Sequence, residues 1–231
     1  MSATIVGQLL SQIVIFMYAF IFFIISFFTT LFFAYAQATP ENGIETSASK
    51  RFIKLDQHGT PLPDQTQDYT TKTWACVFDS QSRLTWEVKA PHGTINKNTH
   101  TYSWYDSDPN TNGGFTGLSN NGQCSPSPCN TQAFVQKLSS INYCGLGNWR
   151  LPTREELRSL VDYTIDFPGP AVNTQYFPNT ISQFYWSANP DARSSDSAWG
   201  IGFTFGYDYS YFKADSGHLR LVHDERTYPT K

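Results

Sequence analysis

Hydrophobic and polar positions along the chain follow two patterns, one long apolar run and then many short alternating segments. Residues 13–33 are almost all apolar or aromatic, and the first forty residues contain no Asp, Glu, Lys or Arg. Such a run can span a hydrocarbon core of ~30 Å. The small residues Ala34 and Ala36 then match a signal-peptidase site. The pattern predicts that residues 1–36 are either a signal peptide or an N-terminal transmembrane anchor.

Both interpretations place the rest of the chain outside the cytoplasm. Residues 1–12 contain no Lys or Arg, whereas a signal peptide begins with basic residues, but a translation start at Met17 gives a segment of ordinary signal length. We expect export to the periplasm, the cell surface or the medium. The alternative is anchoring in the inner membrane with the domain outside the cytoplasm.

The exported part begins with a polar stretch and continues into a globular pattern. Residues 37–68 are rich in Thr, Ser, Pro and Gln, which is typical of a linker. We therefore expect one folded domain at residues 69–226. Alternating segments there predict strands at 74–79, 84–88, 101–105, 184–187, 199–205, 209–213 and 218–223.

Two helices are predicted between these strands. Asn130 or Thr131 can cap the first, whose apolar stripe is Phe134, Leu138 and Ile141. Thr153 can cap the second, and a Glu three residues later completes a capping box. This helix is expected to run to about residue 163. Strands, a loop, two helices and strands again indicate an α+β fold with a mostly antiparallel sheet.

Four cysteines in an exported chain predict two disulfides. Cys129 and Cys144 flank the first helix and would lie roughly 20 Å apart, too far for a bridge. Pairing Cys124 with Cys129 closes a short Ser-Pro loop and leaves Cys76 for Cys144. The other pairing set stays open.

Aromatic residues are unusually frequent, at 16% of the chain. Trp86, Trp149, Trp186 and Trp199 stand in alternating segments, so we expect them in the core. Large and small residues alternate strictly over 199–205, which predicts one core face and one glycine face where something packs closely. The alternating tyrosines that follow are expected to share one exposed, ligand-binding face: Tyr207, Tyr209 and Tyr211.

The polar stretch 106–128 is too long for a mere connection, so we expect it to be a second part of the binding surface. Its oxygen-bearing side chains match the first half of a calcium loop, while Ser119 stands where the bidentate Glu is required. An Asn/Gly turn cluster explains the same residues without a metal. The candidate calcium ligands are Asp106, Asp108, Asn110 and Asn112, and the last three are also candidate ligand-binding residues.

Charge and motifs exclude several function classes. The net charge of −3 argues against nucleic-acid binding, which needs a basic patch. No nucleophile elbow, phosphate loop or dinucleotide fingerprint occurs in the sequence. We therefore expect no catalytic residues and no cofactor other than the candidate calcium.

Several segments resemble the Lcl C-terminal domain family, named for a collagen-like bacterial adhesin. In family order they are TWACVFDSQSRLTWEVK, TYSWY, the helix after Cys129, YCGLGNWRLPTREELRSLVDY, YFPNTISQFYWSA, SAWGIGFTFG and HLRLVHDE. The stretch NWRLPTREEL is also similar to one in the formylglycine-generating-enzyme family. The resemblance implies a C-type-lectin-like fold. It does not imply the enzyme, whose redox cysteines lie late in its chain, because no cysteine follows Cys144 here.

These observations together predict an exported bacterial cell-envelope module for binding or adhesion, without catalysis. Its partner would be a surface glycan or a protein, with membrane contact only through the N-terminal segment. The adhesin's domain is associated with host glycosaminoglycans, whereas this chain has no collagen repeat and is acidic overall. Two alternatives are an enzyme on a formylglycine-generating-like scaffold and a structural subunit of a surface appendage.

Overall fold

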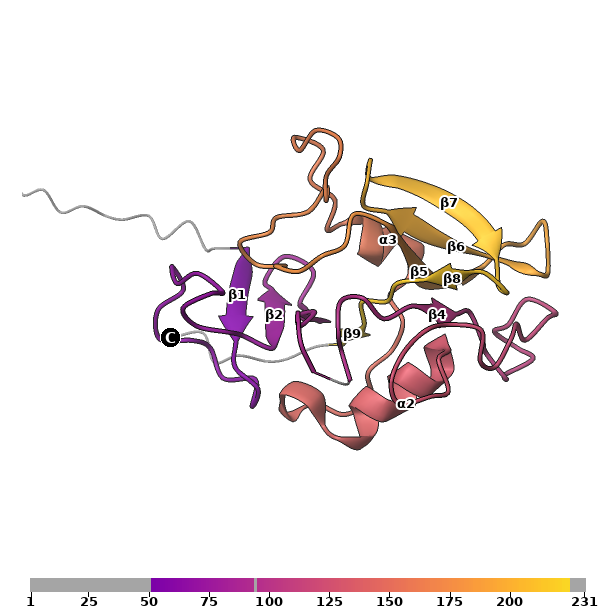
Figure 1. The fold of residues 1–231 in the computed structure, drawn as a ribbon, viewed down its shortest axis with the longest axis horizontal. Coiled ribbons are helices and arrows are strands. Elements are labelled where there is room, and N and C mark those ends of the chain that lie inside the picture. Colours follow the sequence, from indigo (N-terminus) through magenta and orange to yellow (C-terminus); the bar gives the residue numbers. More distant parts are fainter. Residues whose placement is uncertain (1–50, 94, 225–231) are drawn as a thin grey trace, which may run out of the picture. The chain divides into compact units, whose positions relative to one another are not determined.

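The computed structural model describes residues 51–93 and 95–224. The predicted signal peptide or anchor at residues 1–36 lies outside this range. Within it, no helix has the length and apolar character that a bilayer span requires. The described part is an α+β fold of short antiparallel strands and two α-helices, as the sequence predicts (Figure 1).

Three small sheets organise the domain. The first has the order β1-β2-β3-β9, with β1 (Phe52–Leu55), β2 (Cys76–Asp79), β3 (Leu84–Glu87) and β9 (Val222–His223). The second pairs β4 (Tyr102–Ser103) with β8 (Ser216–Gly217). The third has the order β5-β6-β7, with β5 (Phe184–Pro190), β6 (Ser197–Gly202) and β7 (Tyr207–Phe212). The pairing of every named strand is antiparallel.

Strand β1 corrects the predicted linker at residues 37–68. Its residues pair with β2, and Leu55 and Leu62 are buried. A polar composition misled the prediction because the few apolar side chains of this stretch are the ones that face the core. The linker assignment is therefore wrong for residues 51–68, while residues 37–50 lie outside the described part.

The helices begin where the sequence predicts, but the second is shorter. Helix α2 (Thr131–Ser140) is capped by Asn130, whose side chain accepts from the Ala133 amide. Phe134 and Leu138 are buried, whereas Ile141 is exposed. Helix α3 (Arg154–Arg158) ends five residues before the predicted limit. The chain leaves the helix there because Val161 forms a β-bridge with Val172. A short 3-10 turn, η1 (Tyr143–Gly145), follows α2.

Two disulfides tie the elements together. Cys76 in β2 is bonded to Cys144 in η1, and Cys124 is bonded to Cys129, with Cα–Cα distances of 6.5 and 5.5 Å. The preferred pairing is confirmed. The predicted strand at residues 218–223 is only partly formed: β8 lies just before it at Ser216–Gly217 and pairs with β4, and β9 at Val222–His223 pairs with β3.

Candidate functional site

The β6–β7 hairpin builds the most distinctive surface of the domain. Its register pairs Gly202 with Tyr207 and Gly200 with Tyr209. The turn closes through a bond from the Gly206 amide to the Gly202 carbonyl, at 2.8 Å. Gly206 has a φ of +76°, and a Cβ there would lie 2.4 Å from the Val161 side chain. Only glycine fits this turn, so the sequence fixes where the hairpin bends.

Aromatic rings cover the glycine face of the sheet, as the alternation predicts. A Cβ on Gly200 would lie 2.4 Å from Cζ of Phe184, and one on Gly202 would lie 2.9 Å from Cε2 of Tyr209. The missing side chains therefore leave room for these rings to pack against the sheet. Phe184, itself buried, stacks on Tyr211 with ring centroids 4.4 Å apart.

Five exposed aromatic side chains follow one another on this side of the domain. The ring centroids of Phe167 and Phe205 lie 5.1 Å apart, and those of Phe205 and Tyr207 lie 6.2 Å apart, both pairs nearly parallel. Tyr209 and Tyr211 continue the row with centroids 6.1 Å apart. We call these five residues the aromatic strip. Their exposed fractions range from 36% for Tyr209 to 67% for Phe167. Tyr207 and Tyr209 connect the two groups of rings only as alternate residues on one face of β7. Exposed apolar surface of this kind is typical of interaction sites.

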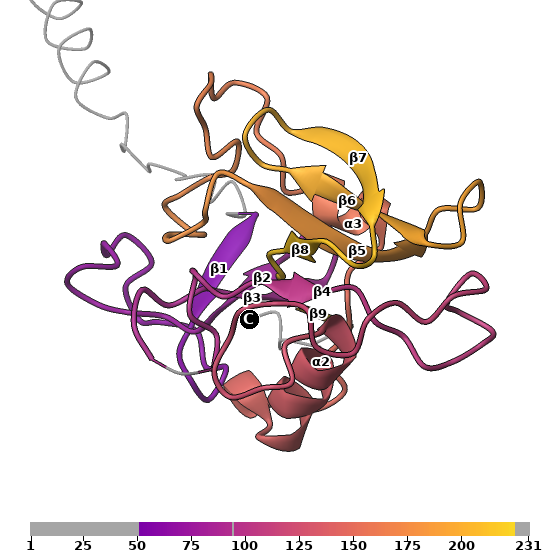
Figure 2. The ribbon, with the colours of Figure 1, turned by 45° about the vertical axis from the view of Figure 1, so that its right-hand side comes forward.

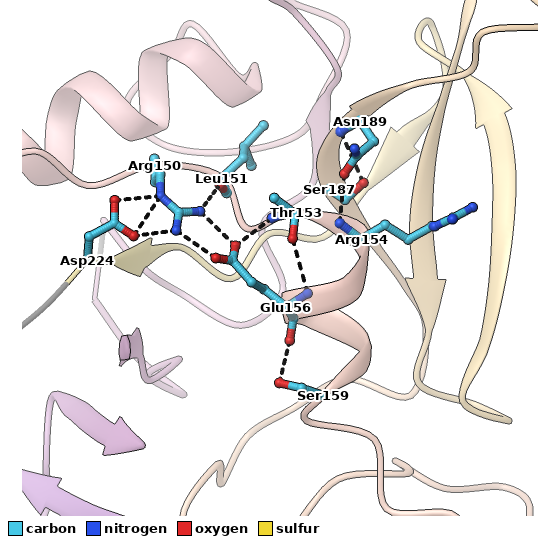
Figure 3. Close-up of polar contacts among 9 residues, drawn as sticks. All are labelled: Arg150, Leu151, Thr153, Arg154, Glu156, Ser159, Ser187, Asn189 and Asp224. Atoms are coloured by element: carbon cyan, nitrogen blue, oxygen red, sulfur yellow. Dashed lines mark hydrogen bonds and ion pairs between the residues drawn. The ribbon is translucent and has the colours of Figure 1, made fainter. Parts of the chain in front are cut away.

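The opposite face of the sheet is held by α3. Thr153 accepts from the Glu156 amide, and the Glu156 carboxylate accepts from the Thr153 amide, which confirms the predicted capping box. Figure 3 shows the Arg150 guanidinium between the carboxylates of Glu156 and Asp224. The Arg154 amide donates to Asn189 Oδ1 of β5, at 2.7 Å. This segment therefore joins the helix to the back of the sheet.

Trp199 lies on this rear face and is not a core residue. It is half-buried, and the guanidinium carbons of Arg154 and Arg193 lie 4.8 and 4.9 Å from its ring centroid. The prediction of a buried ring is wrong for Trp199 because β6 is only partly covered by α3. The same prediction is confirmed for Trp86, Trp149 and Trp186, which are at most 2% exposed.

The tyrosines predicted as ligand residues lie together, and the polar loop is organised separately. Asp106 Oδ1 accepts from the Asp108 amide, Asp108 Oδ1 from the Asn110 amide and Asn112 Oδ1 from the Gly114 amide, all at 2.9 Å. These are successive Asx-type turns. No hydrogen bond or ring contact joins Asp108 or Asn110 to the tyrosines of β7 in the described part of the chain. The side chains of the loop and the tyrosines of β7 are therefore not joined directly, and a shared binding surface stays a prediction.

A buried lysine that the sequence did not single out holds this loop. The Lys213 ammonium donates to the backbone carbonyls of Asn112 and Phe115, both at 2.7 Å, and of Ser195 at 2.6 Å. It lies 4.5 Å from the centroid of the Trp104 ring. Burial lowers the pKa of Lys213, and the nearby carboxylates of Asp196 and Asp106 oppose that shift. Among residues 51–93 and 95–224, no three His, Cys, Asp or Glu side chains are grouped as metal ligands. Calcium binding at Asp106, Asp108, Asn110 and Asn112 stays a prediction.

Other charged side chains lie inside the domain, away from the strip. Lys89 and Glu87 form an ion pair at 2.7 Å, and Glu87 also accepts from the Leu221 amide at 3.0 Å. Arg220 donates to the Thr180 hydroxyl at 2.8 Å. Glu87 and Arg220 are 0% exposed and Lys89 is 2% exposed. Solvent does not reach these groups, so their contacts support the core rather than a surface site.

Two strip residues escaped the sequence analysis. Phe205 was assigned to a core face, but β6 ends at Gly202 and Phe205 lies in the turn, 49% exposed. Phe167 stands in a Pro- and Gly-rich segment without a strand or helix pattern, so only its aromatic side chain could have marked it as a surface-site residue.

Comparison with known proteins agrees with the resemblance seen in the sequence. The family model described as the Lcl C-terminal domain matches residues 75–223. No curated protein and no solved structure matches the chain. Because the family match covers more than half of the 231 residues, the chain belongs to the Lcl C-terminal domain family.

Proposed function

We propose that this chain is an exported binding or adhesion module of a bacterial cell envelope, that it binds a surface glycan on the aromatic strip, and that it performs no catalysis. The observation that supports this most is the aromatic strip, whose five exposed rings lie on β7, in the β6–β7 turn and at Phe167. Aromatic rings offer flat apolar area, and the tyrosine hydroxyls add polar contacts beside it. Tyrosine also loses little conformational entropy when it binds, because only two χ angles become fixed.

The charges around the strip favour an uncharged glycan over an anionic one. In the described residues, no Lys or Arg lies over a ring of the strip; the cation–π contacts involve other rings. Arg154, on the rear face, is already paired with Glu155 and Asp208. We expect the affinity to change less than about twofold between low and high salt, because screening acts on charge pairs and not on ring contacts.

Export is the second part of the proposal. The disulfides Cys76–Cys144 and Cys124–Cys129 are of the kind that forms and persists in oxidising compartments. The apolar leader supports the same location. Mass spectrometry of the mature N-terminus would separate cleavage after Ala36 from retention as an inner-membrane anchor. Four reactive thiols in the unreduced protein recovered from outside the cytoplasm would contradict export with two disulfides.

The family resemblance extends the proposal to the fold. We propose a variant of the C-type-lectin-like fold, supported by the two helices, the antiparallel strands and the disulfides. An experimental structure superposed on that fold would test it.

A glycan array probed with the full chain is the decisive experiment for the binding site. Tyr207→Ala and Tyr211→Ala should each weaken binding of any glycan found by about 1 kcal/mol, or roughly fivefold, as expected for the loss of one aromatic contact. Phe115→Ala is the matched control, because this ring is 40% exposed but lies outside the strip. If both tyrosine variants bind like wild type while Phe115→Ala or Asp108→Ala loses binding, the loop is the site and the strip is not.

A further inference from the structure

The outer side of β7 is an open sheet edge. The sheet order is β5-β6-β7, so within residues 51–93 and 95–224 β7 has a partner strand on one side only. In Figures 1 and 2, β7 forms the outer border of this sheet. The strand is six residues long and contains no Pro or Lys, and its one charged side chain, Asp208, is paired with Arg154 of its own domain. Natural proteins commonly protect an edge with such residues or with a bulge, because an unprotected edge pairs readily with another strand.

The register shows which backbone groups face outward. The Lys213 amide bonds to the Asp196 carbonyl at 2.8 Å, one step beyond the pair Phe212–Ser197. Antiparallel pairs alternate between bonded and non-bonded positions. Tyr211, Tyr209 and Tyr207 are therefore in the bonded pairs with β6. The amide and carbonyl groups of Asp208 and Ser210 point away from the sheet.

The outward edge is complementary to itself. Two copies of β7 can pair antiparallel about a twofold axis at Tyr209. Tyr209 then faces Tyr209, and Tyr207 faces Tyr211. Asp208 faces Ser210, so no two like charges stand directly opposite each other. Aromatic pairs across strands stabilise such a ladder, whereas like charges weaken it.

We propose that two copies of this chain pair through β7, with the twofold axis at Tyr209, to form one continuous six-stranded sheet. The bonds run between the Asp208 and Ser210 backbones of the two copies. The tyrosine rings project from the sheet face and stay accessible, so the two aromatic strips join into one. The proposal does not depend on glycan binding, although a joined strip would raise the avidity for a repeated ligand.

The pairing can be removed without touching the domain's own ladder. Ser210→Pro deletes an outward amide, and proline is tolerated in an edge strand when its nitrogen faces solvent. Ser210→Ala is the matched control, because it retains the amide. A six-residue ribbon is small for an interface, so sedimentation of the full chain in detergent should extend to about 1 mM. We expect wild type and Ser210→Ala to dimerise in a concentration-dependent manner, and Ser210→Pro to shift at least tenfold toward monomer. In dilute solution, Ser210→Pro should have the same thermal midpoint as Ser210→Ala, because both lose the Ser210 hydroxyl beside Asp191.

Cysteine cross-linking tests the register in cells that express the full chain. All four native cysteines are bonded, so an added thiol is free. Facing non-bonded residues lie about 4.5 Å apart at Cα, within disulfide reach. Tyr209→Cys should therefore give a dimer on a non-reducing gel. Tyr211→Cys should not, because its copies are offset by four residues, roughly 13 Å.

Three results would overturn the proposal. The first is a monomeric wild type at every concentration, and the second is equal dimerisation of Ser210→Pro and Ser210→Ala. The third is cross-linking of Tyr211→Cys in preference to Tyr209→Cys. The two proposals can fail independently. A chain that binds glycan but does not dimerise would contradict only the pairing through β7, and a chain that dimerises but binds no glycan would contradict only the proposed function.

Discussion

The loop at residues 106–118 and the strand β7 are both rich in residues that bind ligands, yet the fold uses them in opposite ways. The loop directs its side-chain oxygens to its own amides and its carbonyls to the Lys213 ammonium. Strand β7 exposes its tyrosine rings and the outer side of its backbone. A polar group already paired within the protein has little left to offer a ligand, whereas an exposed ring gains by being covered.

Lys213 explains most of this difference. A loop rich in carbonyl and carboxylate oxygens needs a positive charge to keep it compact. Here a buried ammonium on the residue after β7 provides that charge, with three carbonyl contacts within 2.7 Å. One lysine thus joins the loop to the end of β7.

For the loop, the largest effect is expected from removal of this ammonium. Lys213→Met should lower the free energy of unfolding by about 3 kcal/mol, because three carbonyls lose a charged donor in a buried place. Urea denaturation measures the change. Lys72→Met is the control at an exposed lysine and should stay within about 0.5 kcal/mol. If Lys213→Met lowers the free energy of unfolding by no more than Lys72→Met does, the ammonium does not hold the loop.

The glycine face under the rings gives the next effect. Gly200→Ala places a Cβ 2.1 Å from the Tyr185 carbonyl oxygen and 2.4 Å from the Phe184 ring. Overpacking of this kind costs about 1–3 kcal/mol. Gly147→Ala is the control, since the nearest atom there would be 3.4 Å away. Thermal unfolding of both variants gives the comparison, and equal midpoints would contradict the close packing of rings on this face.

Exposed and buried tyrosines should differ sharply in their contribution to stability. Tyr207→Ala removes a ring that is 59% exposed, so the free energy of unfolding should change by no more than about 0.5 kcal/mol. Tyr102→Ala removes a ring that is 2% exposed and should cost about 3–5 kcal/mol. Chemical denaturation measures both. A large loss for Tyr207→Ala would make the strip a structural element instead of a binding surface.

The smallest effect is expected from the candidate calcium ligands. Because the Lys213 ammonium already holds the loop, removal of calcium with EDTA should leave the thermal midpoint of wild type unchanged. Asp108→Ala should cost under about 1 kcal/mol, through the loss of one exposed turn. Calorimetry with and without calcium measures both. If Asp108→Ala matters only when calcium is present, the half-matched calcium loop is a real metal site.

Local signals in the sequence predicted local structure well. The capping box of Thr153 and Glu156 and the Asn130 cap depend on residues within three positions of each other, and both are confirmed. The hairpin of β2 and β3 follows from a four-residue connection between two apolar runs. The preferred disulfide pairing is correct because the length of one helix excluded a rival bridge. The exposed face shared by the three tyrosines follows from the twofold period of a strand.

Only the tertiary structure decided the features that depend on distant segments. Strand β1 takes its place from pairing with β2, about twenty residues later in the chain, so its composition alone suggested a linker. Lys213 is buried because residues 112, 115 and 195 direct their carbonyls at one point, which no local pattern records. Phe205 is exposed because β6 ends at Gly202, and Phe167 joins it from a segment 38 residues away. Periodicity and capping act within a few residues, whereas burial and exposure depend on which remote segments fill the same volume.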